Sequence, residues 1–233
     1  MVQGNHCAAV LLMAPPLDAL DPFLGLDKSA LRALLLGRRK ALSPAEQVAK
    51  AQALCQWCTQ SEAWQDAEHI AAYWPMHDAE IDPSPLIFQA IAAGKQCYLP
   101  VFEQPAVERL CFVAYQPGDP LVAQAMGFLA PQIHTSTPWV SAADLDLILL
   151  PLIAFDRKGQ RLGRGAGHYD RTLADQYDAA THQARKTLDQ DSRSHRPYLM
   201  GLAYDLQGIP QLPADPWDIP LDAVLTETGL QIF

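Results

Sequence analysis

Residues 145–177 read LDLILLPLIAFDRKGQRLGRGAGHYDRTLADQY, and this stretch decides how the chain folds. It begins with an apolar run, residues 145–150, in which Asp146 is the one polar residue, and this run stops at Pro151. An apolar run without polar alternation is typical of a central parallel strand that is buried on both faces. A basic, glycine-spaced loop follows, and the pattern predicts a helix that begins near His168.

The loop between residues 157 and 171 carries five Lys and Arg residues and one acid, so its net charge is +4 in a chain of net charge −9. Glycines at 163, 165 and 167 alternate with other residues. Backbone amides, cations and a helix N-terminus together predict a site for a polyanion, most simply a nucleotide phosphate. The loop lacks the Gly-Lys-Ser/Thr of a Walker A motif, and its GxGxG spacing differs from the dinucleotide fingerprint.

The chain has 233 residues, enough for one large α/β domain or two small ones, and its acidic balance argues against general nucleic-acid binding. Its five scattered cysteines indicate reduced thiols in a cytosolic protein. Cys55 and Cys58 form a CxxC without a second pair, so we interpret them as packing residues. The apolar run near the N-terminus is too short to span a bilayer. We expect an extension of undetermined order over residues 1–25 and one domain over 26–233.

Strands are predicted over residues 69–74, 96–101, 145–150, 198–204 and 221–226, with a further candidate at 110–115. A helix over residues 83–93 separates the first two, which gives a β-α-β unit and favours parallel strands. We therefore predict a single doubly wound α/β domain, with a mostly parallel sheet and helices on both faces. The polar stretch 179–196 is read as a surface loop.

Two helix starts are marked by capping residues. Asp27 can cap a helix whose Lys28 and Arg32 lie four residues apart and so project from one side. Spacing alone leaves these two cations open to interpretation as a solvated basic face. Ser43, with Pro44 and Glu46, predicts a second helix through a capping box. The acidic loop at Glu80 follows a strand, where open α/β sheets place ligands, although solvated loop acids are equally compatible.

The string from Pro151 to Arg171 resembles the signature of 5-formyltetrahydrofolate cyclo-ligases, also called methenyltetrahydrofolate synthetases. Other features follow in the order of that family. Lys28 and Arg32 are similar to its N-terminal Lys-xxx-Arg, and residues 80–82 (Glu-Ile-Asp) to its acidic folate loop. Residues 201–204 and 222–227 are similar to its closing strands. The resemblance covers about residues 27–227.

The resemblance implies an enzyme that converts ATP and 5-formyltetrahydrofolate to 5,10-methenyltetrahydrofolate, ADP and phosphate, with Mg²⁺. A phosphorylated formyl group is the implied intermediate. The implied partner is the folate, with or without a polyglutamate tail. We further expect a cytoplasmic monomer that binds neither nucleic acid nor membrane.

The resemblance also implies the site residues. The catalytic set is Lys28, Arg32 and Arg164, and the metal ligands are Asp170 and Asp222. Asp170 alone could instead cap a helix or pair with Arg171. The implied ATP-binding residues are Lys28, Arg32, Arg161, Leu162, Gly163, Arg164, Gly165, Ala166, Gly167, His168 and Tyr169. The implied folate-binding residues are Arg32, Trp74, Glu80, Arg164, Gly165, Ala166, Gly167 and His168.

Two residues depart from the family pattern. His168 stands where the family usually has Tyr or Phe, which predicts weaker or pH-sensitive stacking on the folate. Ala166 replaces a common glycine. His168 motivates an alternative function, a catalytically silent folate- or nucleotide-binding relative with a regulatory role. Without the family, a sugar-phosphate or acyl-transfer enzyme is a third hypothesis, which requires a catalytic Glu, Lys or Cys at the loop.

Overall fold

The computed structural model describes residues 22–76, 79–104, 107–124, 127–177 and 196–233. The expected extension over residues 1–25 and the polar stretch 179–196 lie almost entirely outside these ranges. Among the described residues, no helix is both long and apolar enough to cross a membrane.

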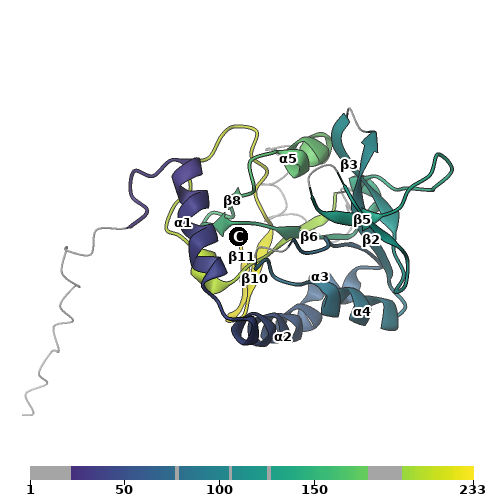
Figure 1. Ribbon diagram of the computed structural model, residues 1–233, viewed down its shortest axis with the longest axis horizontal. Helices are drawn as coiled ribbons and strands as arrows, with labels where there is room; N and C mark the ends of the chain where they lie inside the picture. Colours follow the sequence, from purple (N-terminus) through teal and green to yellow (C-terminus); the bar gives the residue numbers. More distant parts are fainter. Residues whose placement is uncertain (1–21, 77–78, 105–106, 125–126, 178–195) are drawn as a thin grey trace, which may run out of the picture.

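Three α-helices come first in the described chain, and strands with two further α-helices follow (Figure 1). The α-helices are α1 (Lys28–Lys40), α2 (Pro44–Gln60), α3 (Glu62–Asp66), α4 (Ser84–Ala92) and α5 (His168–Leu173). The strands are β1 (His69–Ala71), β2 (Gln96–Gln104), β3 (Val107–Ala114), β4 (Leu121–Ala123), β5 (Leu129–Pro131), β6 (Leu147–Pro151), β7 (Ala154–Phe155), β8 (Arg161–Leu162), β9 (Tyr198–Leu202), β10 (Ala223–Thr226) and β11 (Gly229–Ile232). Short 3-10 turns occupy Ala142–Asp144, Ala174–Gln176 and Asp205–Gln207.

The central sheet of the described chain has seven strands in the order β11-β10-β9-β6-β1-β2-β3. The five inner strands run parallel, and β11 and β3 pair antiparallel at the two edges. This arrangement confirms the predicted mostly parallel α/β sheet. The strand predicted from the apolar run is the middle strand, β6, and residues 147–150 are all buried, as a strand covered on both faces requires.

Helices and loops cover both faces of this sheet. On one face, α2, α3 and α4 bury Leu54, Trp64 and Leu86 against the strands. On the other face, α5 contributes Leu173, and the segment after β6 contributes Leu152 and Phe155. The helix α1 packs on that segment through a separate apolar cluster that includes its Leu31 and Leu35. Each of these helices therefore buries an apolar face. Arg39 of α1 is buried with the leucines, whereas Lys28 and Arg32 are only partly buried.

The direction of the strand order reverses between β6 and β1. The chain moves outward from β1 through β2 to β3, whereas β9, β10 and β11 add on the far side of β6. The loops that leave the carboxyl ends of β1 and β6 therefore turn to opposite sides and leave a crevice between them. Residues 72–76, residues 79–80 and residues 152–168, which include the glycine-rich loop, border this crevice.

Several local expectations were wrong. The segment between Pro151 and His168 is a loop only in part, because β7 and β8 form an antiparallel hairpin within it. The edge strand β11 was not predicted. The strand expected over residues 69–74 ends at Ala71, which leaves Tyr73 and Trp74 in the loop that borders the crevice. Two-residue strands have no readable periodicity, and an edge strand needs only a tertiary partner, so pattern alone misses both.

Candidate active site

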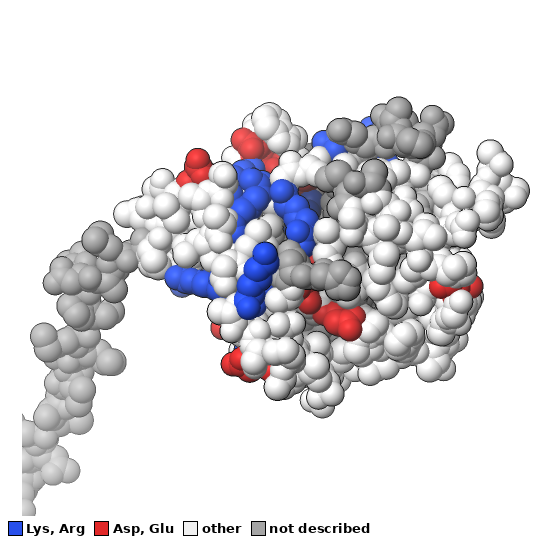
Figure 2. Space-filling view, viewed as in Figure 1, with Lys and Arg blue, Asp and Glu red and all other residues white. Residues whose placement is uncertain are grey.

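A pocket of about 840 Å³ opens at the carboxyl ends of β1 and β6. Figure 2 shows a group of Lys and Arg side chains on this face, beside α1. Every residue predicted to bind ATP or folate lines this pocket, together with Asp170. These predicted residues are Lys28, Arg32, Trp74, Glu80, Arg161, Leu162, Gly163, Arg164, Gly165, Ala166, Gly167, His168, Tyr169 and Asp170.

The helix α1 brings two cations to the pocket because its other face is fixed in the core. Asp27 caps the helix by accepting the Ala30 amide at 2.8 Å, which sets its start at Lys28. Leu31 is 1% exposed and fixes the helix against the core. Lys28 and Arg32 are four residues apart, so they project from one side of the helix, and both line the pocket. The predicted helix start is confirmed, and these two cations line the pocket.

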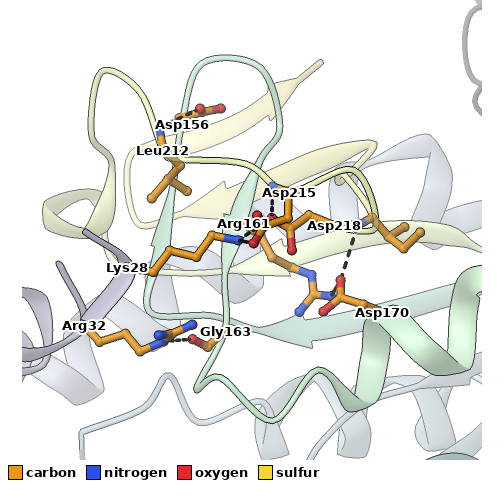
Figure 3. Close-up of polar contacts among 10 residues, drawn as sticks. Lys28, Arg32, Asp156, Arg161, Gly163, Asp170, Leu212, Asp215 and Asp218 are labelled. Atoms are coloured by element: carbon orange, nitrogen blue, oxygen red, sulfur yellow. Dashed lines mark hydrogen bonds and ion pairs between the residues drawn. The ribbon is translucent and has the colours of Figure 1, made fainter. Parts of the chain in front are cut away.

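Arg32 fastens the glycine-rich loop to α1. Its Nε donates to the Gly163 carbonyl at 2.8 Å (Figure 3). Its guanidinium also lies against Gly165, where an added Cβ would stand 3.3 Å from Cζ of Arg32. Gly165 has φ +103°, a conformation that L side chains rarely adopt. The glycine is therefore required both by the backbone and by the approach of the arginine.

Lys28 reaches across to a segment near the C-terminus. Its Nζ lies 2.7 Å from Asp215 Oδ2 and 2.6 Å from Asp218 Oδ2 (Figure 3). Burial alone would lower the pKa of Lys28, but the hydrogen bonds and charges of the two aspartates outweigh it and leave the pKa raised. Lys28 therefore remains a cation at the pocket wall.

Arg161 and Asp170 form a second pair inside the pocket. Arg161 Nη2 donates to Asp170 Oδ1 at 2.7 Å, and the arginine side chain is 5% exposed. Its Cζ lies 5.7 Å from the centroid of the Tyr169 ring. Burial raises the pKa of the Tyr169 hydroxyl, and the positive charge of Arg161 offsets part of that rise. The phenol is therefore neutral, and Asp170 both lines the pocket and balances a buried cation.

A buried carboxylate faces these cations from the other wall. Glu80 Oε1 lies 3.3 Å from Arg164 Nη2, and its Oε2 accepts the Met76 amide at 3.2 Å. The Glu80 side chain is only 5% exposed. Trp74, from the same loop, packs on Tyr115 with ring centroids 5.7 Å apart. The Arg164–Glu80 pair thus joins the glycine-rich loop to the loop that follows β1.

His168 lies at the start of α5, with its ring against Phe102 of β2. The two ring centroids are 4.9 Å apart and the rings meet edge to face at 74°.

Asp156 precedes the glycine-rich loop and orders the turn there. Its carboxylate accepts the amides of Lys158 at 2.8 Å, Gln160 at 3.1 Å and Leu212 at 2.9 Å. These three contacts hold the turn that precedes the glycine-rich loop.

Asp222 is placed away from the predicted metal site. It precedes β10 and so lies at the amino edge of the sheet, outside the pocket lining. Arg196 donates to its Oδ1 at 2.6 Å and to its Oδ2 at 3.1 Å, and the Leu199 amide donates to Oδ2 at 2.8 Å. A carboxylate enclosed by these donors holds strands together, so the structure does not bring Asp222 together with Asp170, and its role as a metal ligand stays a prediction.

Sequence reasoning missed Asp215, Asp218 and Arg171, all of which line the pocket. No role was predicted for the segment that contains the two aspartates. The available signal was two acids that flank Pro216 and Trp217 in an otherwise apolar turn. Among the described residues, no three His, Cys, Asp or Glu side chains form a ready metal cage.

Comparison with known proteins places these features in one family. The profile described as the 5-formyltetrahydrofolate cyclo-ligase family matches residues 25–227. The 5-formyltetrahydrofolate cyclo-ligase of Escherichia coli strain K12 is 35% identical over 191 residues, which cover 81% of this chain and 94% of that protein. The protein of the same name from Haemophilus influenzae is 34% identical and covers 68% of this chain and 75% of its own.

Solved structures agree with this assignment. The 5,10-methenyltetrahydrofolate synthetase of Aquifex aeolicus superposes with a TM-score of 0.67 at 28% identity, over 88% of this chain and 92% of that one. A 5,10-methenyltetrahydrofolate synthetase from Mycoplasma pneumoniae, at 24% identity and a TM-score of 0.61, shows the same fold. The chain, with its glycine-rich loop, the Lys28 and Arg32 of α1 and the closing strands, belongs to the 5-formyltetrahydrofolate cyclo-ligase family.

Proposed function

We propose that this chain catalyses the ATP-dependent conversion of 5-formyltetrahydrofolate to 5,10-methenyltetrahydrofolate, with release of ADP and phosphate. The observation that carries the proposal is the Arg164–Glu80 contact of 3.3 Å across one pocket. It joins a cation-rich glycine loop, which suits a triphosphate, to a buried carboxylate, which suits the donor-rich edge of a pterin. The family assignment supports the same reaction.

The proposed chemistry has two steps. The formyl oxygen of the folate attacks the γ-phosphorus of ATP, the bond from that phosphorus to the bridging oxygen breaks, and ADP leaves. N10 of the folate then attacks the activated formyl carbon and loses its proton, and the carbon–oxygen bond to phosphate breaks as the ring closes. Phosphoryl transfer of this kind needs positioning and charge neutralisation more than a covalent nucleophile from the protein.

The cations of the pocket are arranged for that neutralisation. Lys28 and Arg32 come from α1, whereas Arg161 and Arg164 come from the glycine-rich loop. We assign all four to the triphosphate, together with the loop amides of residues 163–167. Lys28, Arg161 and Arg164 each hold a carboxylate in the structure. A polyanion that enters the pocket would exchange with these carboxylates as the partner of the three cations.

Two carboxylates of the pocket, those of Asp170 and Asp218, are suited to bind a divalent cation. Asp170 and Asp218 both line the pocket, and each balances a cation that the phosphates would take over. Mg²⁺ prefers one or two carboxylates together with phosphate oxygens. We therefore assign Asp170 and Asp218 to Mg²⁺, which would neutralise charge on the transferring phosphoryl group. Asp222, enclosed at the opposite edge, is not part of this assignment.

The folate is assigned to the wall formed by Trp74, Glu80 and His168. Glu80 is buried and already paired, so a ligand that displaces Arg164 must offer hydrogen-bond donors of its own. The aminopterin ring has such donors. We further propose that the protein acts as a cytoplasmic monomer on the folate with or without a polyglutamate tail. The buried free thiols Cys55, Cys58, Cys97 and Cys111 support a reducing compartment.

The purified protein, given 5-formyltetrahydrofolate and Mg·ATP, should produce the near-ultraviolet absorbance of the methenyl product, and omission of ATP should abolish it. Tight folate binding without product would contradict the enzyme assignment. That result would favour the alternative motivated by His168, a catalytically silent relative that binds folate or nucleotide. Product that forms without ATP would contradict the phosphoryl-transfer steps and leave the folate site intact.

A further inference from the structure

Arg171 holds the last residues of the glycine-rich loop from within α5. Its Nη2 donates to the Ala166 carbonyl at 2.6 Å and lies 3.2 Å from Nδ1 of His168. Its backbone amide donates to the Gly167 carbonyl at 3.0 Å. One residue therefore contacts three consecutive members of the pocket wall, residues 166–168, while its own side chain also lines the pocket.

The chemistry of the Arg171–His168 contact decides the tautomer of the imidazole. A guanidinium has N–H donors and no acceptor, so Nδ1 of His168 must be the acceptor in this hydrogen bond. An accepting Nδ1 carries no proton. The ring in this geometry is therefore neutral, with its one proton on Nε2.

The plane of the same ring is set by Phe102 of β2, and the backbone of His168 is held from β3. Phe102 of β2 meets it edge to face with centroids 4.9 Å apart. The His168 carbonyl accepts the Thr172 hydroxyl at 2.7 Å, and that hydroxyl accepts the Leu110 amide of β3 at 2.8 Å. Contacts from α5, β2 and β3 thus hold both the backbone and the side chain of His168.

Gly167 leaves the space that Arg171 needs. A Cβ on Gly167 would stand 2.8 Å from Nη1 of Arg171, closer than such contacts occur in proteins. Gly167 also has φ +67° at the start of α5. The glycine therefore serves the arginine as well as the turn of the backbone.

We propose that Arg171 is a positioning residue that fixes His168 as a neutral imidazole with its proton on Nε2. His168 then forms an uncharged aromatic part of the wall, although Lys28, Arg32, Arg161, Arg164 and Arg171 line the same pocket. A neutral ring can pack on a flat heterocycle as a phenyl or phenol ring does. The expected consequence for folate binding rests on the proposed function, whereas the tautomer does not.

The tautomer is tested by nuclear magnetic resonance of the full chain with ¹⁵N-labelled histidine, at about pH 8, above the ordinary titration of imidazole. Signals that disappear in His168→Phe belong to His168. In the wild type we expect Nε2 to have the shift of a protonated nitrogen and Nδ1 that of an accepting one. In Arg171→Met the ring is released, so both shifts should move toward the averaged values of a free imidazole.

Arg109→Met is the matched control, because Arg109 lies beside the same segment but pairs with Asp175 at 2.6 Å on the surface. It should leave the His168 signals in place. A proton on Nδ1 or a charged ring in the wild type would overturn the proposal. So would His168 signals that are the same in Arg171→Met as in the wild type.

Kinetics at the same pH test the positioning role. Loss of one fixed hydrogen bond in Arg171→Met should raise KM for 5-formyltetrahydrofolate about fivefold, with a smaller change in KM for ATP. Arg171→Lys keeps a side-chain donor, so its KM for the folate should fall between those of the wild type and Arg171→Met. An unchanged KM for the folate would overturn the positioning role. A wild-type protein that forms no product would instead refute the proposed function, and the magnetic resonance result would still decide the tautomer.

Discussion

The two edges of the central sheet use their aspartates differently. At the amino edge, Asp146 accepts the amides of Glu68 and His69 at 2.9 and 2.8 Å, which joins the start of β6 to the start of β1. Asp222 does the same for β10 and β9 and encloses Arg196, with side chains only 11% and 7% exposed. Both carboxylates join neighbouring strands. Asp146 is exposed to solvent, whereas the Asp222–Arg196 pair is enclosed.

At the carboxyl edge, the aspartates instead balance cations that a ligand can reach. Lys28 and Asp215 are 24% and 44% exposed, and Asp170 is 22% exposed where it meets Arg161. All four side chains line the pocket. The comparison predicts that an ion pair beside a cavity can exchange its carboxylate for a ligand, whereas an ion pair of the same kind enclosed between strands is structural.

The largest expected effect is at the amino edge. Asp222→Ala leaves a buried Arg196 without its carboxylate, so the free energy of unfolding should fall by about 3 kcal/mol in urea denaturation. The Mg²⁺ dependence of turnover by the folded fraction should stay as in the wild type. Unchanged stability together with a lost Mg²⁺ response would identify Asp222 as a metal ligand. That result would contradict the distinction between the two edges of the sheet.

The second effect is at the carboxyl edge. Arg164→Ala and Asp170→Ala should each lower the turnover of the folded protein at least tenfold, about 1.4 kcal/mol of lost transition-state stabilisation. Asp175→Ala is the control, since Asp175 is 61% exposed and pairs with Arg109 on the surface. Wild-type rates in the two pocket variants would remove these residues from the active site.

The smallest effect concerns the interior between the edges. Burial raises the pKa of the Cys55 and Cys97 thiols to about 11, and burial also raises that of Cys58. In a Cys7→Ser background, alkylation by iodoacetamide at about pH 8 should be slow in the native protein and fast in denaturant. The folded state keeps these thiols protonated. The free energy of unfolding should therefore decline as the pH rises from the ordinary thiol pKa of 9.0 toward 11. Rapid native alkylation of Cys55 and Cys58 would indicate a redox pair in place of packing residues.

The parts of the fold that were predictable are those with strong local signals. The apolar run gave β6, and the capping residues Asp27 and Ser43 gave the starts of α1 and α2, with the capping box at Glu46 confirmed. The glycine-rich string located the pocket wall, because its chemistry is contained within one segment.

The parts that failed depend on contacts between distant segments. Asp218 has no local pattern, and its place is evident only from its bond to Lys28, 190 residues away. The position of Asp222 follows from strand direction. It precedes β10, and the residue before a parallel strand lies at the edge opposite to the pocket. Strand direction, applied to that one residue, would have placed it away from Asp170.

The bridge from Lys28 to Asp215 and Asp218 also bears on how the pocket forms. The two acidic partners lie 187 and 190 residues after Lys28 along the chain. Closure of so long a loop is entropically costly, and contacts of such high sequence separation slow folding. This wall of the pocket therefore depends on contacts between distant segments, whereas the start of α1 needs only the local capping bond from Ala30 to Asp27.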